Sequence, residues 1–426
     1  MVKNVSRKRN ANMKYSLFGI LLENIEKRKL KRDILTLAFV SILTKIVIIF
    51  ITTNVFNSFV DLFDISVYLG YALNTYQGQI PYVDFSIEYP QLALVPILTP
   101  LIFAIITQNL NTYLNVYQMF MTILDMLTTL LVYFIALRYY SQKRAFLSGI
   151  LYATSFSSAY FVITKFDAFP SFLLMLSLFF FIYKRETAGY IWGALAFLAK
   201  WFPVFAIPYY LIFDYQNNKP LSYIAKKAAI SSAVVIAVML PFFAYNPSMF
   251  IETYKLQIGR EPLAHSFIYY INYILSNISH FSLPANAATL LMLIGQIILL
   301  YKYYKLNSKS YKSVSIFIFS SIFLFVILNQ VFSPQYILWI TPFFSLFLLN
   351  TSKGVILHYL CQTWFYLEFP LLYNSIYTNG HYYQLGNVFL SIPFLFFTIK
   401  FAILFSIAIT ILKQIDDRPA NKNKNQ

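Results

Sequence analysis

Long apolar runs recur along most of this chain, and they constrain its fold more than any other feature. A helix needs about 20 apolar residues to cross the roughly 30 Å hydrocarbon core of a bilayer. Only 12% of the residues are charged and 59% are hydrophobic, which is too apolar for an ordinary soluble domain. The runs are continuous and do not alternate, so helices are favoured over a membrane barrel. The sequence therefore predicts an all-α polytopic membrane protein.

The apolar runs differ in length, and some are ambiguous. They lie near residues 33–52, 112–137, 145–163, 168–184, 188–199, 203–213, 228–245, 286–303, 313–329, 336–350, 354–372 and 388–412. The runs 188–199 and 203–213 are short for two spans, and could form one bent helix or two half-depth helices. A further run, 91–107, is also short and contains Pro96 and Pro100.

Positive charges between the runs predict the topology, because loops rich in Lys and Arg stay on the cytoplasmic side. If 91–107 is a re-entrant or interfacial segment, nearly all basic clusters fall on one side of the membrane. These clusters are the N-terminus, 138–144, 184–185, 219–227, 302–312, Lys353 and the tail from Lys413. We therefore expect about twelve crossings of the cell membrane, with both termini in the cytoplasm.

The same reasoning predicts the organisation of the chain. Residues 1–32 form a basic cytoplasmic segment, 33–412 a single transmembrane domain, and 413–426 a cytoplasmic tail. Two large outer loops are expected: 53–110, with amphipathic helices and the re-entrant or interfacial segment, and 246–285. Ten of the first 32 residues are Lys or Arg. Such clusters beside membrane spans set orientation, so the lipid bilayer is an expected partner and nucleic acid is not.

The first outer loop is purely acidic. No Lys, Arg or His occurs between Lys45 and Arg138, yet this stretch contains five acids: Asp61, Asp64, Asp84, Glu88 and Asp125. The first four lie in the outer loop. Most other polar side chains that could take part in catalysis or binding also fall on the predicted outer side, in 165–167, 200–201, 246–285 and 330–335. Structural polar groups would be scattered more evenly, so this concentration predicts a site at the outer face.

The spacing of Asp61, Asp64 and Tyr68 places them on one stripe of a helix that begins at Asp61. An apolar stripe lies beside it, which predicts an amphipathic helix at the interface with two carboxylates pointing one way. The alternative is a solvated face that only keeps the helix at the surface. Residues 78–82 then predict a turn, and residues 88–90 the start of another helix.

Several short motifs follow one another in order. They are Asp61-x-x-Asp64-x-x-x-Tyr68, Gly78-x-x-Pro81-Tyr82-x-Asp84, Glu88-Tyr89-Pro90, Lys165-Phe166-Asp167, Ala188-Gly189-x-x-x-Gly193, Lys200-x-x-Pro203 and Phe332-Ser333-Pro334-Gln335-Tyr336-x-x-Trp339-x-x-Pro342. Over residues 55–345 this set resembles the C-type glycosyltransferases, integral membrane enzymes that take sugars from polyprenyl-phosphate carriers. It is most similar to the polyprenyl-phosphate-mannose-dependent mannosyltransferase family. The chain departs from that pattern at Gln91, where a second Pro is common, and at Lys165.

The resemblance implies an inverting transfer of a sugar, mannose in that family, from a polyprenyl-phosphate donor to a lipid or glycan acceptor at the outer face. The acceptor hydroxyl attacks the anomeric carbon and the polyprenyl phosphate leaves. A carboxylate within hydrogen-bond reach of that hydroxyl would be the general base. Asp61 stands where the family has its first-loop acid, and Asp64 is the alternate.

The remaining candidates are expected to bind substrate. Lys200 and Arg260 could receive the charge of the leaving phosphate. Both residues also have a purely structural interpretation. Lys200 could only extend its ammonium group to the membrane interface, and Arg260 could pair with Glu261 at the surface. The other expected substrate-binding residues are Tyr68, Tyr82, Asp84, Glu88, Asp167, His265, Gln335 and Tyr336.

Some of these residues also have structural interpretations. Asp84 and Glu88 could fix the loop or bind sugar hydroxyls, and a lone His265 is more often structural. Gln335 and Tyr336 could satisfy backbone groups at a Pro-interrupted helix start. No cofactor is firmly implied. The acidic residues could bind a divalent metal, but their spacing in the sequence matches no characteristic metal-binding motif, so no metal site is predicted.

Two charges, Lys45 and Asp125, lie inside predicted spans, and we expect a buried architectural pair. The main rival function is a transporter or flippase for a lipid-linked or polar substrate. Transporters place polar groups near the membrane midplane, often in repeated halves, whereas here they collect at one face without a visible repeat. A third hypothesis is a scaffold or assembly subunit without catalysis, in which Asp61 would be dispensable.

Overall fold

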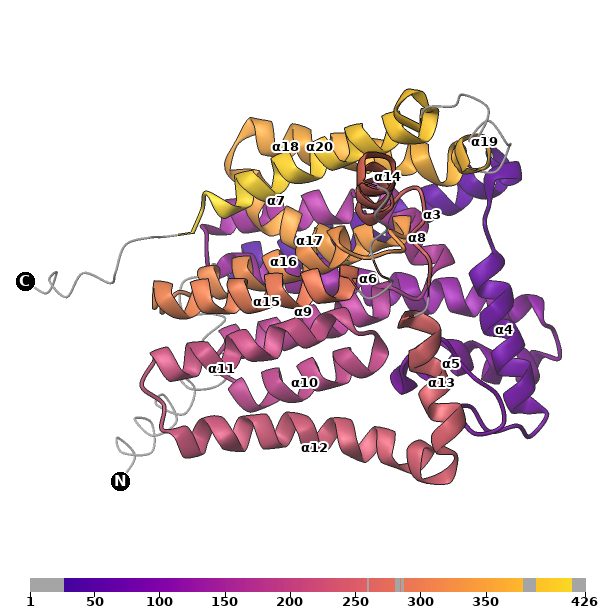
Figure 1. The fold of residues 1–426 in the computed structure, drawn as a ribbon, viewed down its shortest axis with the longest axis horizontal. Helices are drawn as coiled ribbons and strands as arrows, with labels where there is room; N and C mark the ends of the chain where they lie inside the picture. The colour runs from indigo at the N-terminus through magenta and orange to yellow at the C-terminus, as the bar shows by residue number, and fades with distance from the viewer. Residues whose placement is uncertain (1–26, 259, 280–283, 285–286, 378–387, 416–426) are drawn as a thin grey trace, which may run out of the picture.

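The computed structural model describes residues 27–415, except 259, 280–283, 285–286 and 378–387 (Figure 1). Within these residues the fold is all-helical, and the one β-bridge joins Pro81 to Phe85. The predicted all-α class is therefore confirmed for this part of the chain. Most of the predicted basic segment 1–32 and of the tail 413–426 lies outside the described residues.

The first half of the chain forms nine α-helices within the described residues: α3 (Lys27–Asn54), α4 (Phe63–Tyr76), α5 (Leu94–Thr107), α6 (Asn111–Leu137), α7 (Gln142–Ala153), α8 (Phe156–Thr164), α9 (Ala168–Ile182), α10 (Glu186–Ala199) and α11 (Ala206–Gln216). The second half continues with α12 (Leu221–Tyr245), α13 (Pro247–Ile258), α14 (Phe267–Ser279), α15 (Ala287–Leu306), α16 (Tyr311–Ile327), α17 (Ile337–Phe347), α18 (Ser352–Tyr366), α19 (Tyr373–Tyr377) and α20 (Ile392–Leu412). Short 3-10 turns, including η2 (Gln91–Ala93), η3 (Phe202–Phe205) and η4 (Pro334–Tyr336), precede several of them.

Five of the described helices are long and apolar enough to cross a membrane: α3, α6, α12, α15 and α20. The pair α7 and α8, bent by 54°, would make a sixth span. In α12 and α15, only 6% and 17% of the most apolar window is buried inside the protein. Apolar surface of this extent is stable only against lipid, so the chain is a membrane protein. Twelve crossings remain a prediction, because the other apolar runs form shorter helices.

The basic turns of the described chain gather at one end of the helices. The Arg138 guanidinium lies 5.4 Å from the Tyr183 ring centre, and Asn350 donates to the Tyr140 hydroxyl at 3.3 Å. The Tyr139 hydroxyl likewise reaches the carbonyl of Tyr311 at 3.3 Å. The helices α4, α5 and α13 lie at the opposite end (Figure 1). We name these the basic end and the loop end; which of them faces the cytoplasm stays a prediction.

The helix α5 does not carry the chain from one end to the other. Just before it, Pro90 lines a cavity at the loop end, and just after it, Tyr117 of α6 packs on Tyr68 of α4. Fourteen residues of helix extend about 21 Å, which is less than a bilayer core. The segment thus leaves and returns at the loop end, as a re-entrant or interfacial segment would.

The helices α9 and α10 run between the two ends although they are short. The helix α9 begins after Asp167 at the loop end and ends at Tyr183, against Arg138. Its 15 residues extend about 22 Å. The distance from Asp167 to the basic end is therefore shorter than the roughly 30 Å hydrocarbon core of a bilayer. A site built on Asp167 therefore lies at a short distance from the basic end.

The predicted helix at Asp61 begins two residues later than expected. The α4 helix starts at Phe63, and the Asp61 carboxylate accepts a hydrogen bond from the Phe63 amide at 2.9 Å. Asp61 thus caps the helix from outside because its side chain satisfies a free backbone donor of the first turn. The next predicted helix start, at 88–90, is a bend at Glu88 and Tyr89 followed by an extended Pro90, and the 3-10 turn η2 begins at Gln91.

Candidate functional site

Asp61 and Asp64 converge on one buried ammonium group. The Lys165 Nζ lies 2.9 Å from Asp61 and 3.1 Å from Asp64, and the lysine side chain is only 4% exposed. The Tyr160 hydroxyl also accepts from the Asp61 amide at 3.1 Å, which fixes the loop before α4. The two carboxylates do point one way, but they face a lysine rather than open solvent. Lys165 is the position at which the chain departs from the family pattern.

A second cluster joins three elements around Asp167, at the start of α9. Its fully buried carboxylate accepts from Lys200 at 2.6 Å and from the Trp339 indole at 2.7 Å. The Lys200 ammonium also lies 4.8 Å from the Phe166 ring centre and 5.3 Å from that of Trp339. These contacts are too specific for a lysine that only snorkels. The structure thus brings Asp167 and Lys200 together, although they are 33 residues apart in sequence.

The third ion pair joins the two long loops of the chain, 53–110 and 246–285. Arg260 donates to Glu88 at 2.6 Å, and both side chains are more than a third exposed. The alternative partner predicted for Arg260 was its neighbour Glu261. The structure instead pairs Arg260 with a residue of the first loop, so this contact ties the two loops together at the cavity mouth.

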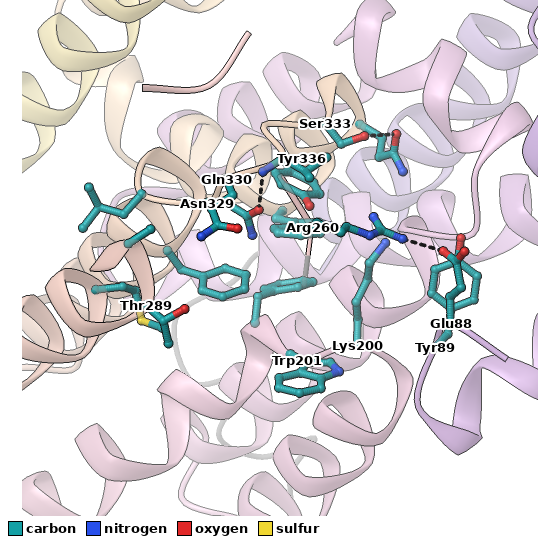
Figure 2. Close-up of a pocket in the computed structure, with 18 of the residues that line it drawn as sticks. Glu88, Tyr89, Lys200, Trp201, Arg260, Thr289, Asn329, Gln330, Ser333 and Tyr336 are labelled. Atoms are coloured by element: carbon teal, nitrogen blue, oxygen red, sulfur yellow. Dashed lines mark hydrogen bonds and ion pairs between the residues drawn. The ribbon is translucent and has the colours of Figure 1, made fainter. Parts of the chain in front are cut away.

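A cavity of about 240 Å³ lies at the loop end, bounded by these cations (Figure 2). Lys200, Arg260 and Glu88 form its polar side, and Figure 2 shows Lys200 and Arg260 reaching the same region as Glu88 and Tyr89. Its aromatic walls are Tyr89, Trp201, Phe202, Tyr336 and Trp339. The apolar wall comes from α15 and α16, through Ala288, Met292, Phe325 and Leu328. A cavity with these walls suits an amphiphile with an anionic group.

Aromatic side chains separate the Asp61–Asp64–Lys165 cluster from the cavity. Tyr68 packs edge-on against Tyr89 and Phe166, with ring centres 6.0 Å and 5.6 Å away. The Tyr68 hydroxyl contacts Asp64 at 3.4 Å, while Tyr89 lines the cavity. Burial raises the pKa of both tyrosines well above the usual value, so they remain neutral. Asp61 and Asp64 therefore lie behind this partition and do not line the cavity.

Two predicted substrate-binding residues hold the first loop in shape. The Asp84 carboxylate accepts from the Ile80 amide at 2.7 Å and closes the turn. Tyr82 is fully buried and donates to the Tyr89 carbonyl at 2.8 Å. The structure thus gives both residues a loop-fixing contact, and it does not bring either of them to the cavity. Their effect on the site is to hold Tyr89 in place.

His265 lies away from the cavity, in a different cluster. Its ring is 5.3 Å from the Tyr377 ring centre, and its carbonyl accepts from Lys400 at 3.4 Å. Burial, together with the Lys400 charge, lowers the pKa of His265 to about 3. The imidazole is therefore neutral at physiological pH and packs as part of the structure, which agrees with the structural alternative.

Gln335 and Tyr336 both line the cavity, from the 3-10 turn before α17. Gln335 accepts a hydrogen bond from the Ser333 hydroxyl at 2.6 Å, and this bond is drawn in Figure 2. The Tyr336 ring stacks on Trp339 with centres 3.8 Å apart. This stack supports the indole that donates to Asp167, so Tyr336 helps position the ion pair of Lys200.

The buried pair of Lys45 and Asp125 is present as predicted. Both side chains are 2% exposed, and the Tyr152 hydroxyl donates to Asp125 at 2.7 Å. The expectation that only these two charges lie inside spans was wrong. Glu368 and Lys400 form a second pair at 2.7 Å, with both side chains fully buried. The signal was available, since each is a single charge within a long apolar run.

Two residues of the site were not singled out from the sequence. Lys165 was taken only as part of a motif, and Trp339 only as the aromatic end of another. A lysine three residues after Val162 in an apolar, aromatic stretch signals a buried ion pair, but its partners are about 100 residues away. No spacing rule connects such distant positions.

Among the described residues, no group of three or more His, Cys, Asp or Glu side chains is arranged to hold a metal ion. No protein-family model matches the chain, and no curated protein matches its sequence. The functional argument therefore depends on the residues and the geometry of the site.

Proposed function

We propose that this chain is a membrane glycosyltransferase that moves a sugar, mannose by the family resemblance, from a polyprenyl-phosphate carrier to a lipid or glycan acceptor at the outer face, with inversion. The observation that carries the proposal is the cavity at the loop end, where Lys200 and Arg260 lie beside aromatic and apolar walls. Cations would stabilise the departing phosphate, aromatic faces would stack on a sugar, and the apolar wall would contact the carrier.

The reaction requires that the acceptor oxygen bond to the anomeric carbon while the bond from that carbon to the phosphate oxygen breaks. The phosphate leaves with the electron pair, and a carboxylate takes the hydroxyl proton. Asp61, with Asp64 as alternate, is the proposed base. Glu88 is a competing candidate because it lines the cavity. Because Asp61 and Asp64 lie behind the Tyr68–Tyr89 partition, either can act as the base only if these rings move and let the acceptor hydroxyl and the anomeric carbon meet beside the carboxylate.

The test is transfer of label from polyprenyl-phosphate mannose in membranes that contain the full chain. Wild type is compared with Lys200→Gln, and Lys255→Gln on α13 is the control because that lysine is exposed at the same end. Loss of one cation at a developing charge costs about 2–4 kcal/mol, so we expect the Lys200 variant to lose at least about tenfold in rate. Equal rates for the three proteins would contradict the proposal.

The identity of the base is tested in the same assay with Asp61→Asn, Asp64→Asn and Glu88→Gln. We expect Asp61→Asn to lose about 100-fold or more, as for removal of a general base. If Asp61→Asn keeps the wild-type rate of mannose transfer while Glu88→Gln loses it, Glu88 rather than Asp61 is the base. The amount of folded protein, from size-exclusion chromatography in detergent, must match wild type for each variant.

One observation favours the rival transporter or flippase: three described spans contribute to two buried ion pairs, Lys45 of α3 with Asp125 of α6, and Lys400 of α20 with Glu368, which follows α18. Intramembrane charges often mark a translocation path. Uptake of a labelled lipid-linked sugar into vesicles that lack any acceptor would identify transport. A glycosyltransferase would release the polyprenyl phosphate only when an acceptor is present.

A further inference from the structure

A second cavity, of about 370 Å³, lies at the basic end between two turns. One turn joins α11 to α12 and the other joins α15 to α16. The lining includes Gln216, Asn218 and Lys219 from the first turn, and Asn307 and Lys309 from the second. The glycosyl-transfer site at the loop end uses none of these residues, so this cavity requires a separate explanation.

The cavity lies at the level where two membrane spans end. The α12 span begins at Leu221, which lines the cavity, and the α15 span ends at Leu306, just before Asn307. These are the two candidate spans with the smallest buried share, and α11 lies between them in Figure 1. Tyr215, which lines the cavity, is 49% exposed, and Tyr301 and Tyr304 on the last turns of α15 are 59% and 46% exposed. Exposed tyrosines at span ends mark the headgroup layer of a bilayer.

The charge of the cavity is positive. Lys219 and Lys309 both line it, and Lys302 and Lys305 lie on the last turns of α15. Asp214, the acid closest in sequence, is buried, accepts a hydrogen bond from the Tyr190 hydroxyl at 2.9 Å and does not line the cavity. It offsets part of the Lys219 charge, so the two lysines that line the cavity leave it with a net positive charge. Basic pockets between membrane helices at this level bind phosphate-bearing lipid headgroups.

Gln216 adds a more specific requirement. Its amide Nε2 donates to the carbonyls of Tyr303 and Tyr304 at 3.1 Å and 3.2 Å, which joins the two turns. This assigns the amide orientation, because a flipped group would place an oxygen against two carbonyl oxygens. The side chain is 6% exposed, and its Oε1 has no hydrogen-bond partner among the described residues. A buried acceptor of this kind needs a donor, and an anionic oxygen cannot be one.

We propose that this cavity binds the phosphoglycerol headgroup of an anionic phospholipid. The phosphodiester oxygens would pair with Lys219 and Lys309, and a glycerol hydroxyl would donate to the Gln216 Oε1. The acyl chains would lie along the exposed apolar faces of α12 and α15. The site combines a cationic pair with a buried acceptor, so it selects a headgroup that carries both a phosphate and a hydroxyl. This inference does not depend on the glycosyl-transfer proposal.

The experiment measures lipid binding to the purified full chain in detergent by native mass spectrometry. Phosphatidylglycerol is compared with phosphatidylmethanol of the same acyl chains, which has the phosphodiester but no headgroup hydroxyl, and with phosphatidylcholine. Lys219→Gln/Lys309→Gln is the test variant. Lys302→Gln/Lys305→Gln is the matched control, because it removes the same charge at the same end but outside the cavity lining.

We expect wild type to retain phosphatidylglycerol better than phosphatidylmethanol, and phosphatidylcholine least. Each cation that pairs with the phosphate contributes about 1 kcal/mol, so the test variant, which loses two, should lose about 30-fold in phosphatidylglycerol binding while the control changes less than about twofold. Equal losses in both variants would show general charge attraction and overturn the site. Full competition by soluble glycerol 3-phosphate at lipid-equivalent concentration would overturn the lipid headgroup as the occupant. Equal binding of phosphatidylglycerol and phosphatidylmethanol would overturn the role of Gln216.

Discussion

At the residue scale, Lys165, Lys200 and Arg260 at the loop end each have a carboxylate partner. Lys165 lies between Asp61 and Asp64, Lys200 bonds to Asp167, and Arg260 bonds to Glu88. Charges recessed into a membrane are stable only when they are paired. A phosphate that enters the cavity must therefore share Lys200 and Arg260 with carboxylates. The Asp167 carboxylate is fully buried, so it can hold the Lys200 ammonium at the cavity without itself contacting a ligand.

The Lys45–Asp125 pair gives a prediction about stability. Asp125→Asn leaves the Lys45 ammonium buried without its counter-charge, and we expect the free energy of unfolding to fall by about 3–5 kcal/mol. The double variant Lys45→Met/Asp125→Leu removes both charges and should recover most of this loss. Thermal unfolding in detergent, followed as loss of the monomer peak in size-exclusion chromatography, measures both. If the double variant were the less stable of the two, the unpaired charge of Lys45 would not be the cause of the loss.

His265 gives a prediction about pH. Its pKa, about 3 in the folded protein, lies below the ordinary 6.5, so the unfolded chain binds an extra proton below pH 6.5. Its contribution to stability is complete above pH 6.5 and is lost as the pH falls toward 3, by about 1 kcal/mol per pH unit. The apparent Tm in detergent should therefore fall between pH 7.5 and 5.5. His265→Gln should reduce that fall, and an unchanged profile would contradict it.

At the scale of elements, the close packing of α10 on α9 positions Lys200 against Asp167. A Cβ atom added at Gly189 would lie 3.0 Å from the Phe181 Cβ and 3.1 Å from its backbone nitrogen. Backbone atoms of a packed helix cannot move aside cheaply, so Gly189 permits this approach. The small-residue motif recognised in the sequence therefore has a physical reason in the contact of these two helices.

Gly189→Ala should separate α9 from α10 and lower both stability and transfer rate. The expected destabilisation is about 1–3 kcal/mol, as for overpacking in a tight interior. Gly70→Ala on α4 is the matched control, because an added Cβ there has open space around it. That control should be neutral or slightly stabilising, since Ala is a better helix former than Gly. Unfolding temperature and labelled-mannose transfer are measured for both variants, and equal behaviour would contradict the packing argument.

At the scale of the whole molecule, the two ends of the helical bundle differ in chemistry. The basic turns meet at one end, and the three ion pairs of the first loop, the second loop and α10 meet at the other. Because α9 is short, the loop-end site is recessed toward the basic end.

The topology is tested by cysteine labelling in intact cells. The single Cys361 is fully buried and is replaced by Ala in the background. Cysteines are then introduced at the exposed positions Ser66, at the loop end, and Lys143, at the basic end. We expect an impermeant maleimide to label position 66 from outside and position 143 only after permeabilisation. Labelling of both positions from the same side would refute the predicted topology.

The sequence by itself determined the helical class and the presence of candidate membrane spans, because these depend on run length and composition. It also predicted the Lys45–Asp125 pair, since each is a lone charge at similar depth in neighbouring spans. Only the tertiary structure decided which cation meets which acid. The pairs Lys165–Asp61 and Lys200–Asp167 join residues 104 and 33 positions apart, and helix packing rather than local spacing brings them together. For the same reason, only the structure placed Asp61 and Asp64 behind an aromatic partition, away from the cavity.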